Sequence, residues 1–287
     1  MTNAQDLLFD VQINDNPANT NSEYSKIVTA TIPMPDGIHG CEEVKPLNYC
    51  SPRFNLLKNE NVFPVIEKML DDAKCEYVRA YKMNDDMTTF HAQYIIKTYK
   101  GNDVGIDVGG YGDNIYPTAI VDNSYNGQLQ GALTFGYFRM ICSNGIVIPL
   151  EGHEEKNFMI KGKHTQKLSF SFEQLLQKLN YFLGEQENLL KRFEVMTDRI
   201  VPTFEERVVE VLTATSIAAS KDQFRAISDI IRNEAKTLGT SVNDFLIYNA
   251  INGHIFKGVD SKGNKSKALP EVKRKDDKKV LKYMMAN

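Results

Sequence analysis

Residues 115–148 constrain the fold most, because they combine two strand-forming runs with a strong turn signal. Residues 118–121 precede the turn and residues 129–141 follow it, and β-branched or aromatic side chains are frequent in both runs. Asn126 and Gly127 lie between them, and this pair tolerates the positive φ that a two-residue hairpin loop requires. The stretch therefore predicts a central antiparallel hairpin.

The segments before this hairpin predict further strands and one helix. Strands are expected at residues 27–32, 76–83 and 89–98. Tyr77, Arg79 and Tyr81 alternate with Val78, Ala80 and Lys82, which predicts one solvent-exposed face for the pair formed by the second and third of these strands. A helix is expected to begin at Asn59 or Asn61, either of which can act as an N-cap, and to reach Asp72.

After Pro149 the pattern becomes helical. Four segments open with a Ser or Thr that has an acidic or amide side chain three positions later, which is typical of a helix N-terminus: Ser171, Thr203, Ser220 and Ser241. The first helix is expected to run to about residue 200 with a heptad-like apolar stripe. Gly239 and Gly253 are expected to end the third and fourth.

These elements predict an α+β fold, with an N-terminal, mostly antiparallel sheet containing one early helix and a C-terminal helical region. Residues 1–24 are expected to be a flexible arm, whose apolar island at residues 7–9 could dock on a neighbouring subunit. Residues 25–162 are expected to form the β-rich region and residues 163–256 the helical region. Residues 257–287 are expected to be a basic tail, closed by an amphipathic helix near residues 278–285.

The charge of the chain is uneven. Residues 257–287 hold ten Lys or Arg and four Asp or Glu, a net charge of +6, so the other 256 residues carry −9 of the total of −3. Such asymmetry favours an acidic partner for the tail, although a solvated terminal segment explains it equally well. The tail residues proposed to contact that partner are Lys273, Arg274, Lys275, Lys278 and Lys279.

Several classes of protein are disfavoured. No run of about 18 apolar residues is present, so we expect no membrane segment. Residues 1–22 lack the pattern of a signal peptide, and the four cysteines show no CxxC spacing. We therefore expect reduced thiols, no zinc site and a location in a cytoplasm.

A basic and aromatic cluster is the preferred candidate site. Phe135, Tyr137 and Arg139 share one face of an extended strand, and they offer a stacking surface beside a phosphate-binding guanidinium. Further polar residues join them if residues 158–160 fold back alongside: Asn144, Lys161, Lys163 and His164. The alternative is a structural ion pair between Arg139 and Asp122 or Glu151.

Other candidate chemistry is less favoured. Asp103, Asp107 and Asp113 lie among glycines and could bind a divalent ion, but the calcium-loop pattern is absent. Cys142 could act as a nucleophile with His164 as its base, but a cysteine in an apolar strand is more often a core residue. No nucleotide-phosphate loop is present. We therefore expect no metal and no cofactor, and we favour a non-enzymatic protein over an enzyme.

Several short motifs resemble one known family. They are residues 123–127, 139–144, 163–165 and 248–251, together with an Asn-rich segment at residues 51–61. The chain resembles, over about residues 49–283, phage and plasmid proteins that carry the domain of unknown function nine-three-two. The resemblance implies a phage or mobile-element setting and no particular activity.

These observations predict a phage or mobile-element protein that binds nucleic acid, with single strands in replication or recombination as the expected target, and that forms homo-oligomers in a host cytoplasm. The basic tail, the Arg139 strand and the resemblance motivate this prediction. The alternative is a non-enzymatic interaction factor, such as an inhibitor of a host defence complex or an assembly component, with a host or phage protein as its partner. The acidic body and the expected long helix favour that alternative.

Overall fold

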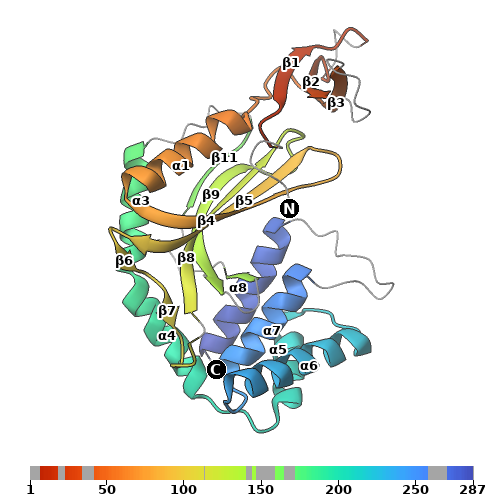
Figure 1. The fold of residues 1–287 in the computed structure, drawn as a ribbon. Helices are drawn as coiled ribbons and strands as arrows, with labels where there is room; N and C mark the ends of the chain where they lie inside the picture. Colours follow the sequence, from red (N-terminus) through yellow and green to blue (C-terminus); the bar gives the residue numbers. More distant parts are fainter. Residues whose placement is uncertain are drawn as a thin grey trace. The chain divides into compact units, whose positions relative to one another are not determined.

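The computed structural model describes residues 7–18, 23–33, 42–112, 114–139, 144–146, 159–164, 172–257 and 270–286. Its strands and helices confirm the predicted α+β class (Figure 1). The chain forms two compact units, one of Met1–Asp103, Thr118–Phe135 and Lys156–Asn180 and the other of Val104–Pro117, Gly136–Glu155 and Tyr181–Asn287. The units therefore differ from the expected succession of a β-rich region and a helical region, because each unit consists of three separate segments of the sequence.

The main sheet is antiparallel and has the strand order β10-β9-β8-β5-β4. Short strands extend it, since β11 pairs with β9, β6 with β5 and β7 with β8. Its strands are β4 (Cys75–Met83), β5 (Thr89–Tyr99), β6 (Asn102–Asp103), β7 (Ile106–Asp107), β8 (Asn114–Ser124), β9 (Gly131–Arg139), β10 (Asn144–Ile146) and β11 (Met159–Gly162). The strands predicted at residues 76–83 and 89–98 and the central hairpin are thus confirmed.

The connection in the central hairpin is longer than the two residues predicted. β8 ends at Ser124 and β9 begins at Gly131. The Ser124 hydroxyl braces the loop, because it donates to the Leu129 carbonyl at 2.8 Å and accepts from the Leu129 N–H at 3.1 Å. Gly127 has a φ of +72°, so its conformational freedom is used within this wider loop.

A separate three-stranded antiparallel sheet, of order β1-β2-β3, contains β1 (Asp10–Asp15), β2 (Lys26–Pro33) and β3 (Glu42–Cys50). The flexible arm predicted for residues 1–24 is therefore wrong for its described part. Leu7 is fully buried, and its carbonyl accepts a hydrogen bond from Asn59 Nδ2 at 3.0 Å. Phe9 packs edge-on against Tyr125, with ring centroids 6.0 Å apart. The apolar island docks within its own unit.

Helix α1 (Phe63–Asp72) begins later than predicted. A 3-10 turn, η2 (Asn59–Asn61), precedes it, and Val62 is the N-cap without a side-chain hydrogen bond. Asn59 instead uses its side chain in the core, where its Oδ1 accepts from Asn123 Nδ2 at 2.9 Å. This tertiary hydrogen bond and the one to the Leu7 carbonyl explain why Asn59 does not cap the helix.

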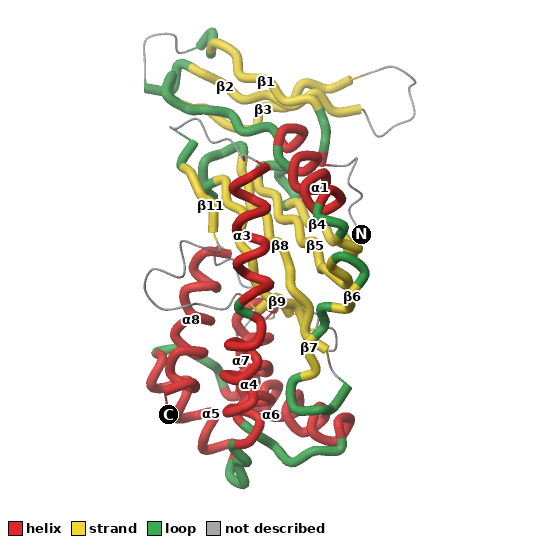
Figure 2. The backbone as a smooth tube through the Cα atoms, turned by 90° about the vertical axis from the view of Figure 1, so that its left-hand side faces the viewer, coloured by secondary structure: helices red, strands yellow, loops and turns green. Residues whose placement is uncertain are grey.

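Most of the described helices belong to the second unit. Figure 2 draws the helices in red. They are α3 (Phe172–Gly184), which spans both units, and α4 (Gln186–Asp198), α5 (Phe204–Thr215), α6 (Lys221–Leu238), α7 (Asp244–Lys257) and α8 (Pro270–Ala286). The prediction of a single helix at residues 171–200 is wrong, because the helix is interrupted at Glu185, directly after the weak helix former Gly184. Its apolar stripe is nevertheless buried at Leu175, Leu179, Phe182, Phe193 and Met196.

The predicted ends of α6 are confirmed. Ser220 and Gln223 form a reciprocal capping box, and Gly239 closes the helix in the left-handed conformation. The predicted ends of α7 are not. Asn243 caps it by accepting from the Leu246 N–H at 3.0 Å, and the helix continues past Gly253. Burial of the neighbouring Ile251 and Ile255 outweighs the cost of about 1 kcal/mol for a glycine in a helix.

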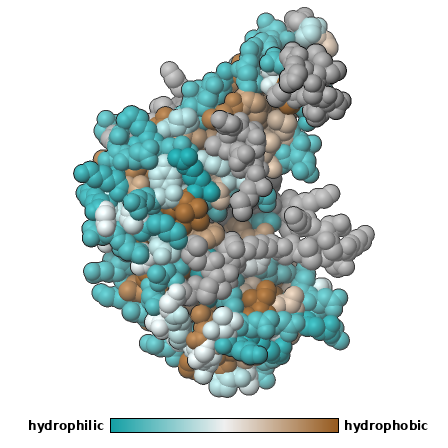
Figure 3. Space-filling model, viewed as in Figure 1, coloured by the Kyte–Doolittle hydropathy of each residue, from teal (hydrophilic) through white to brown (hydrophobic). Residues whose placement is uncertain are grey.

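On the face drawn in Figure 3, hydrophilic residues cover most of the described surface and hydrophobic residues form small separate patches. Within the described chain, no helix is long and apolar enough to cross a membrane, in agreement with the sequence.

Candidate nucleic-acid interface

Strand β9 carries three residues of the predicted stacking surface, and all three are buried. The exposed fractions of Arg139 and Tyr137 are 0% and that of Phe135 is 1%. Burial is continuous along the nine residues of β9, so both faces of the strand are covered. The prediction of an exposed aromatic–arginine face is therefore wrong, because it assumed that this strand had one wet face.

Arg139 takes part in a buried ion pair. Its Nη1 donates to Glu234 Oε2 of α6 at 2.7 Å, and its guanidinium lies 5.5 Å from the ring centroid of Phe245 in α7. The alternative of a structural ion pair therefore describes Arg139 better, but the partner is Glu234 instead of Asp122 or Glu151. Asp122 pairs instead with His91 Nδ1 at 2.8 Å, and Glu151 lies outside the described residues.

The remaining predicted residues are divided between two places. β11 does fold back on β9, and it pairs Lys161 with Ala132 and Gly162 with Gly131. β10 pairs Asn144 with Arg139 at the other end of the strand. Asn144 therefore joins Arg139 in the second unit, whereas Lys161, Lys163 and His164 belong to the first. Lys163 is exposed, and the side chains of Asn144 and Lys161 are outside the described set.

His164 is buried and contacts two other segments of the chain. Its Nδ1 lies 3.2 Å from the Asn55 carbonyl oxygen and its Nε2 lies 3.0 Å from the Leu129 carbonyl oxygen. The imidazole also stacks on Phe54, with centroids 5.1 Å apart. Carbonyl oxygens only accept, so both contacts are hydrogen bonds only when both ring nitrogens carry protons. The ring therefore joins three segments of the first unit, and both of its nitrogens face carbonyl oxygens.

The basic segment at the end of the chain is a docked helix. On α8, Val280, Leu281 and Met284 are fully buried. The opposite positions are exposed and follow the three- and four-residue spacing of one helix face: Val272, Lys275, Lys279, Lys282 and Ala286. We call Lys275, Lys279 and Lys282 the lysine face.

The other tail residues are less accessible. Lys273 Nζ donates to the Phe256 carbonyl at 3.1 Å, and Lys278 is half-buried. Lys279 also pairs with Asp276 at 2.7 Å. Arg274 lies in α8, but its side chain is outside the described set. Lys282 was not predicted, although its spacing from Lys279 and the apolar residues opposite it were visible in the sequence.

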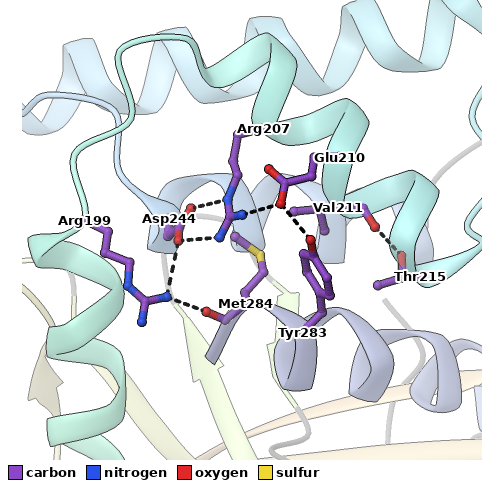
Figure 4. A network of polar contacts seen from close by, with 8 residues as sticks. All are labelled: Arg199, Arg207, Glu210, Val211, Thr215, Asp244, Tyr283 and Met284. Carbon is purple, nitrogen blue, oxygen red and sulfur yellow. Dashed lines mark hydrogen bonds and ion pairs between the residues drawn. The ribbon is translucent and has the colours of Figure 1, made fainter. Parts of the chain in front are cut away.

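A polar network fixes the C-terminal end of α8 (Figure 4). Tyr283 donates to Glu210 Oε1 at 2.6 Å, and Arg199 Nη1 donates to the Met284 carbonyl at 2.8 Å. Arg207 donates to both carboxylate oxygens of Asp244, at 3.1 and 3.0 Å. Hydrogen bonds from Tyr283 and Arg207 lower the pKa of Glu210, so this carboxylate stays charged. The network therefore joins α8 to α4, α5 and the start of α7.

One carboxyl of α8 points into the core. Asp277 is fully buried, and its Oδ1 accepts from Tyr248 at 3.0 Å and from Asn252 at 2.9 Å. Among the described residues, its Oδ2 finds no hydrogen-bond partner. Burial raises the pKa of Asp277 from 3.8 to about 7, more than the two hydrogen bonds lower it. This carboxyl therefore offsets little of the charge of the lysine face below neutral pH.

The raised pKa of Asp277 predicts a pH dependence of stability. The folded protein holds this proton more tightly than the unfolded chain, so the stabilisation is complete below about pH 4 and is lost as pH rises through about 7. Asp277→Asn keeps an acceptor for Tyr248 and removes the titration. Melting temperatures measured from acid to alkaline pH should therefore fall more steeply for wild type than for the variant. Parallel curves would show that the carboxyl is hydrated.

The other candidate sites gain no support. Asp107 accepts from the Gly112 N–H with both oxygens, at 3.0 and 2.9 Å, and Asp113 lies outside the described residues. Among the described residues, no group of three or more His, Cys, Asp or Glu could hold a metal ion. Burial raises the pKa of the free Cys75 thiol to about 11, which disfavours the nucleophilic thiolate, and Cys142 is outside the described part of the chain.

A family model described as "Domain of unknown function (DUF932)" matches residues 46–280. The chain belongs to this family. No match is found among curated proteins or among solved structures.

The family match extends from β3 into α8 and includes two of the three residues of the lysine face, Lys275 and Lys279. The motif residues that carried the resemblance are mainly internal. Asn123, Tyr248 and Asn249 are fully buried, as Arg139 is. Asn123 donates to the Leu57 carbonyl at 2.7 Å and Asn249 to the Phe245 carbonyl at 2.7 Å. In this chain, these motif residues therefore support the interior of the fold.

Proposed function

We propose that this family member binds nucleic acid, preferentially single strands, through the lysine face of α8. The observation that carries the proposal is the exposure of Lys275, Lys279 and Lys282 on one side of a helix whose other side is buried. The phage or mobile-element setting, the role in replication or recombination and the host cytoplasm remain part of the proposal, and rest on the motif resemblance.

The spacing of the lysine face suits a phosphate backbone. With a rise of about 1.5 Å per residue, Lys275 to Lys282 span roughly 10 Å. One nucleic-acid strand carries a phosphate about every 3.4 Å when stacked, so the face spans about three phosphates. Docking of α8 through Val280, Leu281 and Met284 fixes the lysines on one rigid element, which lowers the entropy cost of binding.

The rest of the chain limits the affinity. Residues 1–256 carry a net charge of −9, which repels a polyanion beyond the immediate surroundings of α8. The aromatic residues of β9 are buried and offer no stacking platform. We therefore expect weak binding that is independent of base sequence, with a dissociation constant of roughly 10⁻⁴–10⁻⁶ M at physiological salt.

The test is the combined substitution Lys275→Gln, Lys279→Gln and Lys282→Gln. Anisotropy of a labelled single-stranded oligonucleotide at several salt concentrations should give a log–log slope of about −2 for wild type, because three phosphates are neutralised. The variant should lose this slope and most of its affinity.

A matched control variant removes the same number of lysine charges at other positions of the second unit. Lys191, Lys221 and Lys236 are exposed on α4 and α6, and replacing all three by Gln should leave most of the affinity. Equal losses in both triple variants would point to net charge instead of the lysine face. If wild type binds neither single- nor double-stranded oligonucleotides, the nucleic-acid role fails and the protein-interaction alternative replaces it.

A further inference from the structure

Strand β4 ends the main sheet. Across the described strands its only pairing is with β5, and the ladder runs from Cys75 opposite Tyr99 to Met83 opposite Phe90. An edge strand leaves every second pair of backbone N–H and C=O groups directed away from the sheet. With nine residues and no proline, β4 presents about 30 Å of such an edge.

The side chains on one face of β4 hold the strand to α1. Tyr77 donates to Asp71 Oδ1 at 3.0 Å and Tyr81 donates to Glu67 Oε1 at 2.6 Å. Arg79, between them, lies 3.5 Å from Glu67. These contacts keep the strand extended and in register before any partner arrives.

The other face of β4 is exposed and self-complementary in charge. Glu76, Val78, Ala80 and Lys82 are all exposed, and Val78 retains 52% of its surface. In an antiparallel pair of two β4 strands centred on Arg79, Glu76 of each copy lies opposite Lys82 of the other. Val78 then lies opposite Ala80. Two ion pairs and two apolar pairs therefore form on one face of the joined strands.

We propose that two copies of the chain associate through their β4 edges, so that their main sheets become continuous. The symmetry is that of a closed two-fold dimer, in which the same surface serves both copies. This interface is independent of the lysine face and of nucleic-acid binding. The two Arg79 side chains meet at the axis, and the charge of each is offset by its own Glu67.

The edge strands of the small sheet lack this complementarity. β1 has Asp10 and Asp15 at its ends and no basic residue. β3 contains Pro46, which lacks a backbone N–H to donate, and its charges lie within its first four residues. Of the edge strands β1, β3 and β4, only β4 therefore has charges that complement those of a second copy of itself.

Charge reversal provides the test. Glu76→Lys places like charges opposite each other in both symmetric pairs, and Lys82→Glu does the same. Analytical ultracentrifugation of the full chain should show a dimer for wild type and a dissociation constant at least about tenfold weaker for each variant. An equimolar mixture of the two variants should dimerise again, because a heterodimer restores both opposite-charge pairs.

The matched controls are Asp222→Lys and Arg225→Glu, which make the same charge changes at an exposed pair on α6. They should dimerise as wild type does. A wild type that is monomeric throughout the concentration series overturns the proposal, as do variants that dimerise normally or a mixture that fails to recover. Should either reversal lower the melting temperature, Glu76→Gln and Lys82→Gln replace it, and an unweakened dimer in both again overturns the proposal.

Discussion

Replacing Arg139 by methionine should lower the free energy of unfolding by about 3–5 kcal/mol, because the Glu234 carboxylate, which is only 11% exposed, then loses its ion pair with Arg139. The loss should appear as a lower midpoint in urea denaturation with an unchanged slope. Arg139→Lys should be intermediate, since lysine keeps the charge but not the planar guanidinium over Phe245.

A double-substitution cycle separates the ion pair from packing. Replacing Arg139 and Glu234 together by methionine should cost less than replacing Arg139 alone, because neither charge of the ion pair then remains in the core. Arg225→Met is the control, since its pair with Asp222 is largely exposed and should contribute less than about 1 kcal/mol. An Arg139→Met protein that melts normally but no longer binds oligonucleotides would restore the original reading of Arg139 as a phosphate ligand.

Removing residues 270–287 should unfold or aggregate the second unit. α8 buries Val280, Leu281 and Met284, and its loss exposes the apolar side chains of the helices that it covers. The single substitution Leu281→Ala should cost about 2–5 kcal/mol through the cavity that it creates. Circular dichroism on heating and size-exclusion chromatography measure both effects.

The control for α8 lies on the same helix. Val272 is half-exposed, so Val272→Ala should change the free energy of unfolding by less than about 0.5 kcal/mol. A truncated protein that melts like wild type would show that the segment is a detachable tail, as its composition alone suggests.

Local signals predicted local structure well. The hairpin around Gly127 and the capping box of Ser220 depend on residues within a few positions of each other, and both are present. The break at Glu185 follows Gly184, a local signal that the continuous apolar stripe concealed. The continuation of α7 past Gly253 depends on packing, which propensity does not include.

The candidate site was harder to predict, because the surroundings of its residues are formed by residues that are distant in the sequence. Arg139 pairs with Glu234, 95 residues away, and nothing local distinguishes such a buried arginine from an exposed phosphate ligand. His164 and Tyr248 likewise find partners far along the chain, at Asn55 and Asp277. The lysine face was only partly predicted, since the charge was visible but the docking that orders it was not.

The interleaving of the two units sets an order for folding during synthesis. The first unit takes its last residues from α3 at Asn180, so about two thirds of the chain must leave the ribosome before it can close. The second unit begins at Val104, but it cannot be completed until α8 has been synthesised. At about 5–20 residues per second, the hairpin of β8 and β9 stays incompletely covered for several seconds. Strand β9 is buried along its whole length in the folded protein, and it is therefore the segment on which a chaperone would be expected to act first.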